Sequence, residues 1–184
     1  MFTTAIKRNS IKVKALACFT AIIAAVALPQ IVHGLGVLSG TGPALGQALL
    51  PMHIPVILAG LMFGSLPGAI AGVISPLISY LITGMPAASL LPFMVIELAA
   101  YGVAAGMLAK VKMPSVAKVV IIQLAGRAIR AAAVAAGVLA FGNTAVGLGT
   151  IKAIFVSGLL GIALQWLIVP LILYRFNELA GKNE

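Results

Sequence analysis

The chain has 184 residues, of which 62% are hydrophobic and only 8% charged, and its mean hydropathy is +1.19. A water-soluble domain is roughly 45–50% apolar and about 25% charged, so this composition excludes one. One cysteine and two histidines also exclude a disulfide framework and a zinc cluster. The length suffices for about six spanning helices of roughly 20 residues with short loops. We therefore expect an all-α, polytopic membrane protein that forms a single integral-membrane domain over residues 1–184.

Clusters of glycine, proline and basic residues separate the apolar runs and predict turns and loops. After the first run, the glycine-rich stretch at 34–50 is too rich in small and polar residues to favour a helix, and we expect a flexible loop. The sequence Gly64-Ser-Leu-Pro-Gly68 predicts a tight turn between two short helices. The six expected transmembrane helices span about residues 11–33, 51–64, 68–83, 88–109, 116–141 and 151–174.

The basic residues predict the orientation of these helices. With the N-terminus inside, nine of the twelve lysines and arginines fall in cytoplasmic segments and one, Lys152, falls in an outer segment. Basic loops resist translocation, so both the N- and C-termini are expected to be cytoplasmic. The net charge of +9 is then mostly a topology signal, and we expect no nucleic-acid partner. The nine are Lys7, Arg8, Lys12, Lys14, Lys110, Lys112, Lys118, Arg175 and Lys182.

A cleaved signal peptide is an alternative interpretation of the N-terminus. Basic residues and an apolar stretch precede Ala25-Val-Ala27, which resembles a cleavage site. The loop charges do not decide between the two, because cleavage would leave five helices in the same orientation. The apolar region is long for a signal sequence and continues past Pro29 to Val32, which favours a retained helix.

Three charged residues, Glu97, Arg127 and Arg130, lie within the fourth and fifth spans. A charge at mid-bilayer costs roughly 2.5–3.5 kcal/mol on insertion scales, so each should face the bundle interior or a wet cavity. Helix rise places all three near the midplane or in its outer half, and the i,i+3 spacing puts both arginines on one side of their helix. A structural Glu97–arginine pair is one reading. Because one carboxylate cannot balance two guanidinium groups, we favour a site for an anionic group such as a substrate carboxylate or phosphate.

The two histidines, His33 and His53, are expected at the outer ends of the first and second spans, on either side of the glycine-rich stretch. With the nearby Met52 and Met85 they could hold a transition metal or a haem iron. We favour interfacial histidines that bond to loop carbonyls, and predict no metal site. A pyridoxine- or pyrimidine-like vitamin would be compatible with Tyr101, Gln123, Asn143 and Gln165 as polar contacts. Beside the charged residues, we take His33, His53, Tyr101 and Asn143 as the candidate substrate-binding residues.

Small residues recur at every fourth position in two helices. Ala17, Ala21 and Ala25 form a stripe along the first helix that would let another helix approach closely. That helix could belong to a partner protein or to this chain. Glycines form a similar four-residue repeat at Gly60, Gly64, Gly68 and Gly72. This repeat predicts close packing between the second and third helices.

Catalytic constellations are absent from the sequence. It contains no aspartate, and Glu97 is the only glutamate within an expected span. A phosphate-binding loop, paired catalytic carboxylates and an HExxH motif are also missing. We expect a binding or transport protein rather than an enzyme, with no covalently bound cofactor.

The run from Pro51 to Gly60 (PMHIPVILAG), the following Gly64, Gly68, Gly72 and Pro76, and Thr83-Gly-Met-Pro86 resemble substrate-binding (S) components of energy-coupling factor (ECF) transporters. The resemblance, together with the six spans and the alanine stripe, covers essentially the whole chain. It implies a multi-pass protein of the bacterial cytoplasmic membrane that captures a vitamin or related micronutrient in a pocket in the outer half, lined by the later helices and capped by the first loop.

The same resemblance implies partners. An S component docks on a transmembrane coupling protein driven by two cytoplasmic ATPases, and topples in the bilayer to release its substrate inside. ATP is then used by the partner subunits only. The alanine motif of the first helix faces the coupling protein in such proteins, which here assigns docking to Ala17, Ala21 and Ala25.

Three alternatives remain at this point. The same class of subunit could carry haem or a metal complex, with propionates at the arginines and iron at His33 or His53. A stand-alone secondary transporter or channel would use Glu97 as a proton or ion group and need no ATPase. A structural or assembly protein would bind no small molecule and tolerate loss of Arg127 and Arg130.

Overall fold

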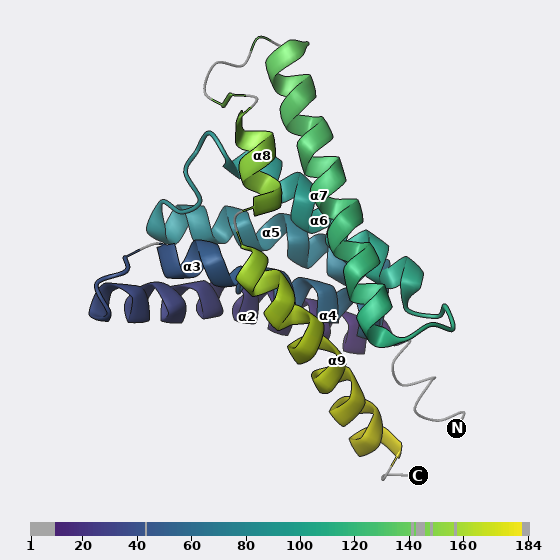
Figure 1. Ribbon diagram of the computed structural model, residues 1–184. Helices are drawn as coiled ribbons and strands as arrows, with labels where there is room; N and C mark the ends of the chain where they lie inside the picture. Colours follow the sequence, from purple (N-terminus) through teal and green to yellow (C-terminus); the bar gives the residue numbers. More distant parts are fainter. Residues whose placement is uncertain are drawn as a thin grey trace.

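The computed structural model describes residues 10–42, 44–140, 142, 146–147, 149–156 and 158–181. These residues are almost wholly helical, with no strand among them, and six stretches are long and apolar enough to cross a membrane, α3 and α4 together forming one (Figure 1). The expected all-α fold with six spans is confirmed. In chain order the helices are α2 (Ile11–Leu38), α3 (Ala44–Leu49), α4 (His53–Phe63), α5 (Ser65–Thr83), α6 (Leu91–Leu108), α7 (Ser115–Leu139), α8 (Gly149–Val156) and α9 (Leu159–Gly181).

Most of the glycine-rich stretch at 34–50 is helical, so the prediction of a loop there is wrong. The helix α2 continues to Leu38, and α3 occupies most of the remainder. In hydrocarbon every backbone polar group needs a partner within the protein, which favours helix even where glycine is frequent. The turn between the two helices is tight: the Gly42 amide donates to the Gly36 carbonyl at 2.9 Å, and a side chain at Gly36 would collide with that turn.

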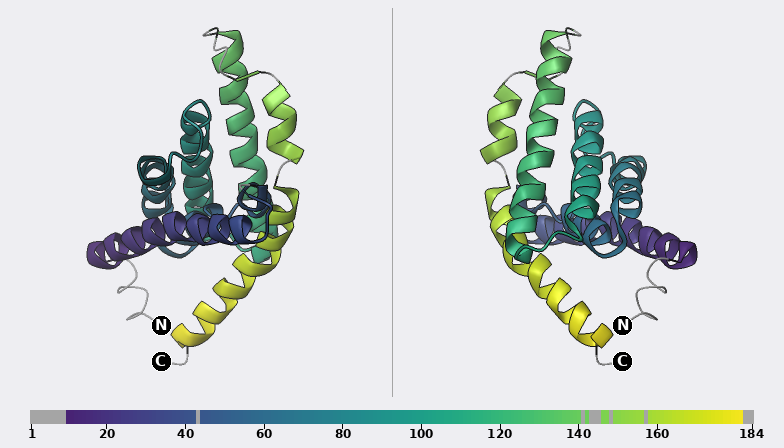
Figure 2. Two further views of the ribbon diagram at one scale, coloured as in Figure 1. Left: turned by 90° about the vertical axis from the view of Figure 1, so that its left-hand side faces the viewer. Right: turned by 90° about the vertical axis from the view of Figure 1, so that its right-hand side faces the viewer.

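The predicted sixth span is divided into α8 and α9. Gly158 between them has φ +79°, a left-handed conformation that glycine adopts without strain. The break lets α8 run beside the upper half of α7, while α9 extends downward past its lower half (Figure 2). A side chain at Gly158 would lie within 2.7 Å of the Leu50 side chain, so the break also seats α9 against the segment between α3 and α4.

Glycines bring α5 and α6 into backbone contact. A side chain at Gly68 would lie 2.8 Å from the Gly102 carbonyl oxygen and 2.8 Å from the Gly60 Cα atom. Gly72 lies in the same way against the backbone at Leu98. The close packing predicted between the second and third helices is therefore present at Gly60 and Gly68, and the stripe extends further onto α6.

Gly64, the remaining glycine of the predicted four-residue repeat, has a different role. It ends α4 with φ +105°, and a side chain there would meet no atom within 4 Å. It is the turn residue that lets α4 and α5 follow one another directly. The neighbouring Ser65 hydroxyl donates to the Val103 carbonyl of α6 at 3.1 Å.

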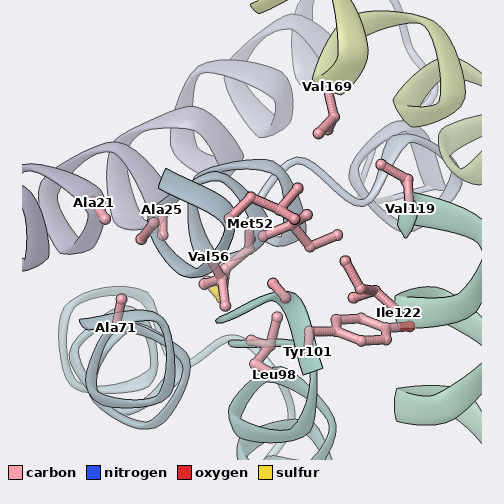
Figure 3. Packing of buried hydrophobic residues seen from close by; sticks show 14 residues of the cluster. Ala21, Ala25, Met52, Val56, Ala71, Leu98, Tyr101, Val119, Ile122 and Val169 are labelled. Carbon is pink, nitrogen blue, oxygen red and sulfur yellow. The ribbon is translucent and has the colours of Figure 1, made fainter. Parts of the chain in front are cut away.

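The alanine stripe of α2 faces the protein's own core. Ala25 is fully buried and Ala21 is 8% exposed, in one cluster with Ala71 of α5 (Figure 3). Ala17 is half-buried. The stripe therefore serves intramolecular packing against α4 and α5, one of the two interpretations of the sequence. Its role in docking stays a prediction, and Ala17 is the member that keeps accessible surface.

The helix ends gather on two sides of the molecule. In Figure 1 the end of α2, the α5–α6 connection and the upper end of α7 lie toward the left and top. The start of α2, the α6–α7 connection and the end of α9 lie toward the right and bottom. The second side carries Lys12, Lys110 and Arg175, whereas Lys152 belongs to α8 on the first. These basic residues therefore lie on one side of the molecule, and the assignment of that side to the cytoplasm stays a prediction.

Replacing Gly102 by alanine is expected to destabilise the fold. The new Cβ atom would overlap the backbone at Gly68, which cannot rotate away as a side chain can. Overpacking of this kind costs about 1–3 kcal/mol, so thermal unfolding in lipid nanodiscs should occur several degrees lower. The control is Gly34→Ala on α2, where nothing lies within 4 Å of the new atom. Equal melting temperatures for the two variants would contradict the contact between α5 and α6.

Candidate functional site

A buried carboxylate lies at the centre of the helix bundle. Glu97 of α6 is 1% exposed, and its Oε2 accepts a hydrogen bond from Arg130 Nη1 of α7 at 2.6 Å. Its Oε1 accepts from the Tyr101 hydroxyl at 2.9 Å. Tyr101 is one helical turn further along α6, so the i,i+4 spacing brings the hydroxyl over the carboxylate. The carboxylate thus has a charged and a neutral donor, as a buried charge requires.

The other arginine of α7, Arg127, lies one helical turn before Arg130. Arg127 is buried, 4% exposed. The ring of Tyr101 lies directly on Gly126, where any side chain would collide with it. The structure therefore brings together the four residues Glu97, Tyr101, Arg127 and Arg130, on the facing sides of α6 and α7.

His53 joins this cluster from the start of α4. Its side chain is 3% exposed, its ring lies 5.2 Å from that of Tyr101 and its Nε2 lies 3.9 Å from Glu97 Oε2. That distance is too long for a hydrogen bond. Neither ring nitrogen has a hydrogen-bond partner among the described residues. The expectation of an interfacial histidine bonded to a loop carbonyl is therefore wrong for His53, because the Pro51–Met52 turn starts α4 inside the bundle.

A cavity of about 400 Å³ adjoins the cluster and is reached by Arg130, His53 and His33. Its size falls within the range of roughly 300–1,000 Å³ that is typical of small-molecule sites. Residues of several helices, from α2 to α8, line the cavity. From α7 the lining includes Arg130. The remaining lining residues are Pro29, Gly46, Gln47, Leu50, Pro51, Met52, Ser79, Met85, Pro86, Ala87, Leu90, Met94, Thr150 and Ala153.

The helix α3 covers one side of the cavity in place of the expected flexible loop. His33 of α2 is half-buried, and its ring lies on Gly46, where a side chain would come within 2.5 Å of His33 Cε1. Gln47 follows on the same short helix. The segment after the first helix thus borders the cavity, as the resemblance implied, but it does so as an ordered helix.

Two glutamines that the sequence offers as candidate polar contacts, Gln123 and Gln165, hydrogen-bond to one another. Gln123 Nε2 of α7 donates to Gln165 Oε1 of α9 at 3.0 Å, and Trp166 Nε1 donates to Gln123 Oε1 at 2.7 Å. Gln165 Nε2 reaches the Leu50 carbonyl at 3.4 Å. Leu50, which lines the cavity, has the unusual φ of +50°. The network therefore fastens a strained cavity-lining residue to α9, and neither glutamine lines the cavity itself.

Other sequence-predicted residues are placed as follows. Tyr101, Glu97 and Arg127 lie behind the cavity wall rather than on it. Asn143 lies outside the described residues. Among the side chains that the structure describes, no group of three or more histidine, cysteine, aspartate or glutamate residues could hold a metal ion. Sequence reasoning missed Pro29, Ser79 and Met94, whose uncharged side chains give no signal apart from the fold.

Comparison with known proteins identifies the class. Residues 17–174 match the family described as ECF transporter, substrate-specific component. This match covers most of the chain, and the chain belongs to that family. It is a multi-pass membrane protein and the substrate-binding subunit of an ECF transporter, which implies association with ECF transmembrane and ATPase subunits. No curated protein and no solved structure gives a significant match to it.

Removing Arg130 alone is expected to cost more stability than removing it together with Glu97. Arg130→Met leaves a carboxylate that is 1% exposed without its charged partner, which typically costs about 3–5 kcal/mol. In the double variant Glu97→Gln/Arg130→Met no such charge remains, and most of the loss should be recovered. Thermal unfolding in nanodiscs measures both.

The control for this pair is Arg175→Met on α9. Arg175 also bonds to a glutamate, Glu178, but it is 69% exposed, so its loss should change stability by no more than about 0.5 kcal/mol. The prediction is contradicted if Arg130→Met has the same melting temperature as Arg175→Met, or if the double variant is no more stable than Arg130→Met. Either result would mean that Arg130 does not stabilise the buried Glu97 carboxylate.

Proposed function

We propose that this chain captures a vitamin or related micronutrient at the outer face of a bacterial cytoplasmic membrane, as the S component of an ATP-driven importer. The observation that carries the proposal is the 400 Å³ cavity beside the buried cluster, reached by Arg130 and His53. A cavity of that size suits a vitamin-sized compound. The family supplies the transport role, and the cavity supplies a place for the substrate.

The position of the cavity supports capture from outside. Its lining includes the start of the α5–α6 connection, through Met85 and Pro86, and the start of α8, through Thr150. Both segments lie on the side that carries few basic residues, which the charge distribution predicts to be external. A substrate would therefore enter from the outer face and meet the charged residues at the inner end of the cavity.

The energy source in this proposal is external to the chain. The sequence contains no nucleotide-binding motif, so a coupling protein and two cytoplasmic ATPases would supply the work. Docking is assigned to α2. The exposed surface of α2 would contact the partner. This surface includes the half-buried Ala17, with Leu16, which is 67% exposed, and Phe19, which is 63% exposed.

A metal complex or haem is the second candidate substrate. His33, His53 and three methionines line one cavity, and these are the side chains that bind soft metals. The cavity lies in the lower part of the size range of ligand sites, which favours a compact compound over a haem macrocycle. A proton-coupled transporter has less support, because Glu97 lies behind the cavity wall and accepts two hydrogen bonds.

The proposal predicts that the purified chain retains a vitamin-sized compound, which mass spectrometry of the released small molecules would identify. Uptake of that compound by cells should require the coupling protein and both ATPases together with this chain. An ATPase variant that cannot hydrolyse ATP is the control, and should abolish uptake without changing binding. Uptake by this chain alone, following a proton or ion gradient, would contradict the S-component mechanism and support the secondary transporter.

A further inference from the structure

We propose that α9 holds α3 in place over the cavity, with Gly161 and Gln165 as positioning residues that act on the segment at Leu50. A substrate then enters or leaves when this contact between α9 and Leu50 parts. The inference rests on the proposed function and adds to it a control on access to the cavity. It is carried by the contacts of Leu50, by the close approach of α9 to α3, and by a buried polar network that aims Gln165 at Leu50.

Leu50 connects two parts of the cavity wall. Its backbone amide donates to the Gly46 carbonyl of α3 at 3.1 Å, and its carbonyl accepts from the backbone amide of His53, at the start of α4, at 3.2 Å. Gly46, Leu50 and His53 all line the cavity. The position of Leu50 therefore fixes both the end of α3 and the start of α4.

The conformation of Leu50 needs support from outside its own segment. Its φ of +50° is left-handed, which is unfavourable for a residue with a side chain and persists only where surrounding contacts hold it. The adjoining α3 has six residues, too few to be a stable helix alone. It packs mainly against α2, which precedes it in the chain, and against α9. The helix α9 is thus the distant element that keeps this segment in place.

Two glycines let α9 lie directly on the carbonyl end of α3. A side chain at Gly161 would come within 2.4 Å of the Leu49 carbonyl oxygen and 2.7 Å of the Ala48 carbonyl oxygen. A side chain at Gly158 would collide with the side chain of Leu50. These atoms belong to the backbone of α3 and to a cavity-lining residue, so any added bulk on α9 would push the cavity cover away.

A chain of buried hydrogen bonds gives the contact its direction. The indole of Trp166 can only donate, so it fixes Gln123 Oε1 as an acceptor and leaves the Gln123 amide nitrogen to donate to Gln165 Oε1. The amide nitrogen of Gln165 then points at the Leu50 carbonyl, 3.4 Å away. This distance is long for a hydrogen bond, and the bond is accordingly weak. It can break during an opening while the rest of the network stays intact.

Parting of α9 from α3 would remove one wall of the cavity. The helix α3 contributes Gly46 and Gln47 to the lining, and the ring of His33 lies on Gly46. Movement of a covering segment of this kind is a common way of admitting and enclosing a substrate. Ser79 of α5 lies on the same cavity wall and is 3% exposed, so access to it reports on the opening.

The test measures how fast a cysteine at position 79 reacts with sulfonatoethyl methanethiosulfonate. Cys18 is the only cysteine in the sequence, so a Cys18→Ala/Ser79→Cys chain carries a single reporter thiol. The full-length chain is used in lipid nanodiscs, after any retained compound has been exchanged away. The reagent is larger than water and Ser79 is 3% exposed, so modification should be slow and should follow the fraction of molecules that are open.

Two variants in this background weaken the contact by different means. Gly161→Ala introduces overlap with the backbone at Leu49 and should raise the modification rate about tenfold or more, as overpacking displaces α3. Gln165→Met removes the donor to Leu50 and should raise it about threefold to tenfold, the usual effect of losing one buried hydrogen bond. The second variant adds no overlap, and so tests the same contact if Gly161→Ala does not fold.

Two alanine substitutions elsewhere serve as matched controls. Gly34→Ala on α2 places its new atom where nothing lies within 4 Å, and should leave the modification rate unchanged. Gly102→Ala disturbs the contact between α5 and α6 and should lower the melting temperature without raising the rate. The second control separates an opening at Leu50 from a general loss of stability.

Three results would overturn the inference. The first is that Gly161→Ala and Gln165→Met react at the rate of Gly34→Ala. The second is that Gly102→Ala accelerates the reaction as much as Gly161→Ala does. The third is that Ser79→Cys in the otherwise unaltered contact reacts as fast as Arg175→Cys, at a position that is 69% exposed. None of them bears on ATP-dependent uptake with the partner subunits, which tests the proposed function separately.

Discussion

A carboxylate buried within membrane-spanning helices must be neutralised inside the protein, and the pairing of Glu97 organises much of this structure. The pair with Arg130 joins α6 to α7 at 2.6 Å, and His53 at the start of α4 lies 3.9 Å from the same oxygen. Three helices thus converge on one group. The arginine is at the same time part of the cavity wall, so the interaction that holds the helices together also determines where a substrate would meet positive charge.

Close backbone packing makes room for this arrangement. The glycines of α5 and α6 remove the side chains between those helices, and Gly126 of α7 lets the ring of Tyr101 lie against the helix backbone. Small residues permit such contacts in lipid, where the hydrophobic effect does not drive helices together. The cavity lies elsewhere, between α2, α4 and the outer connections, and its lining includes several methionines and prolines. Packing and binding therefore occupy different parts of one small bundle.

The sequence predicted the features that depend on strong local signals. Apolar run length predicts the six spans, and the cost of charge in lipid predicts that Glu97 and the arginines face inward together. It could not predict the partners of neutral residues, because these depend on how helices cross. Gln123 and Gln165 bond to one another across 42 positions, and the stripe containing Ala25 turned out to face α5. The helicity of the glycine-rich stretch was also missed, since propensity measured in water undervalues helix in hydrocarbon.

The central claim is that Arg130, held in place by Glu97, contacts a substrate bound in the cavity. An experimental structure of the purified chain with its retained compound tests this most directly. The account predicts ligand density in the cavity, in contact with Arg130 and with the Glu97–Arg130 contact intact. Density at another place in the bundle, or an Arg130 that has left Glu97 and turned away from the ligand, would contradict it.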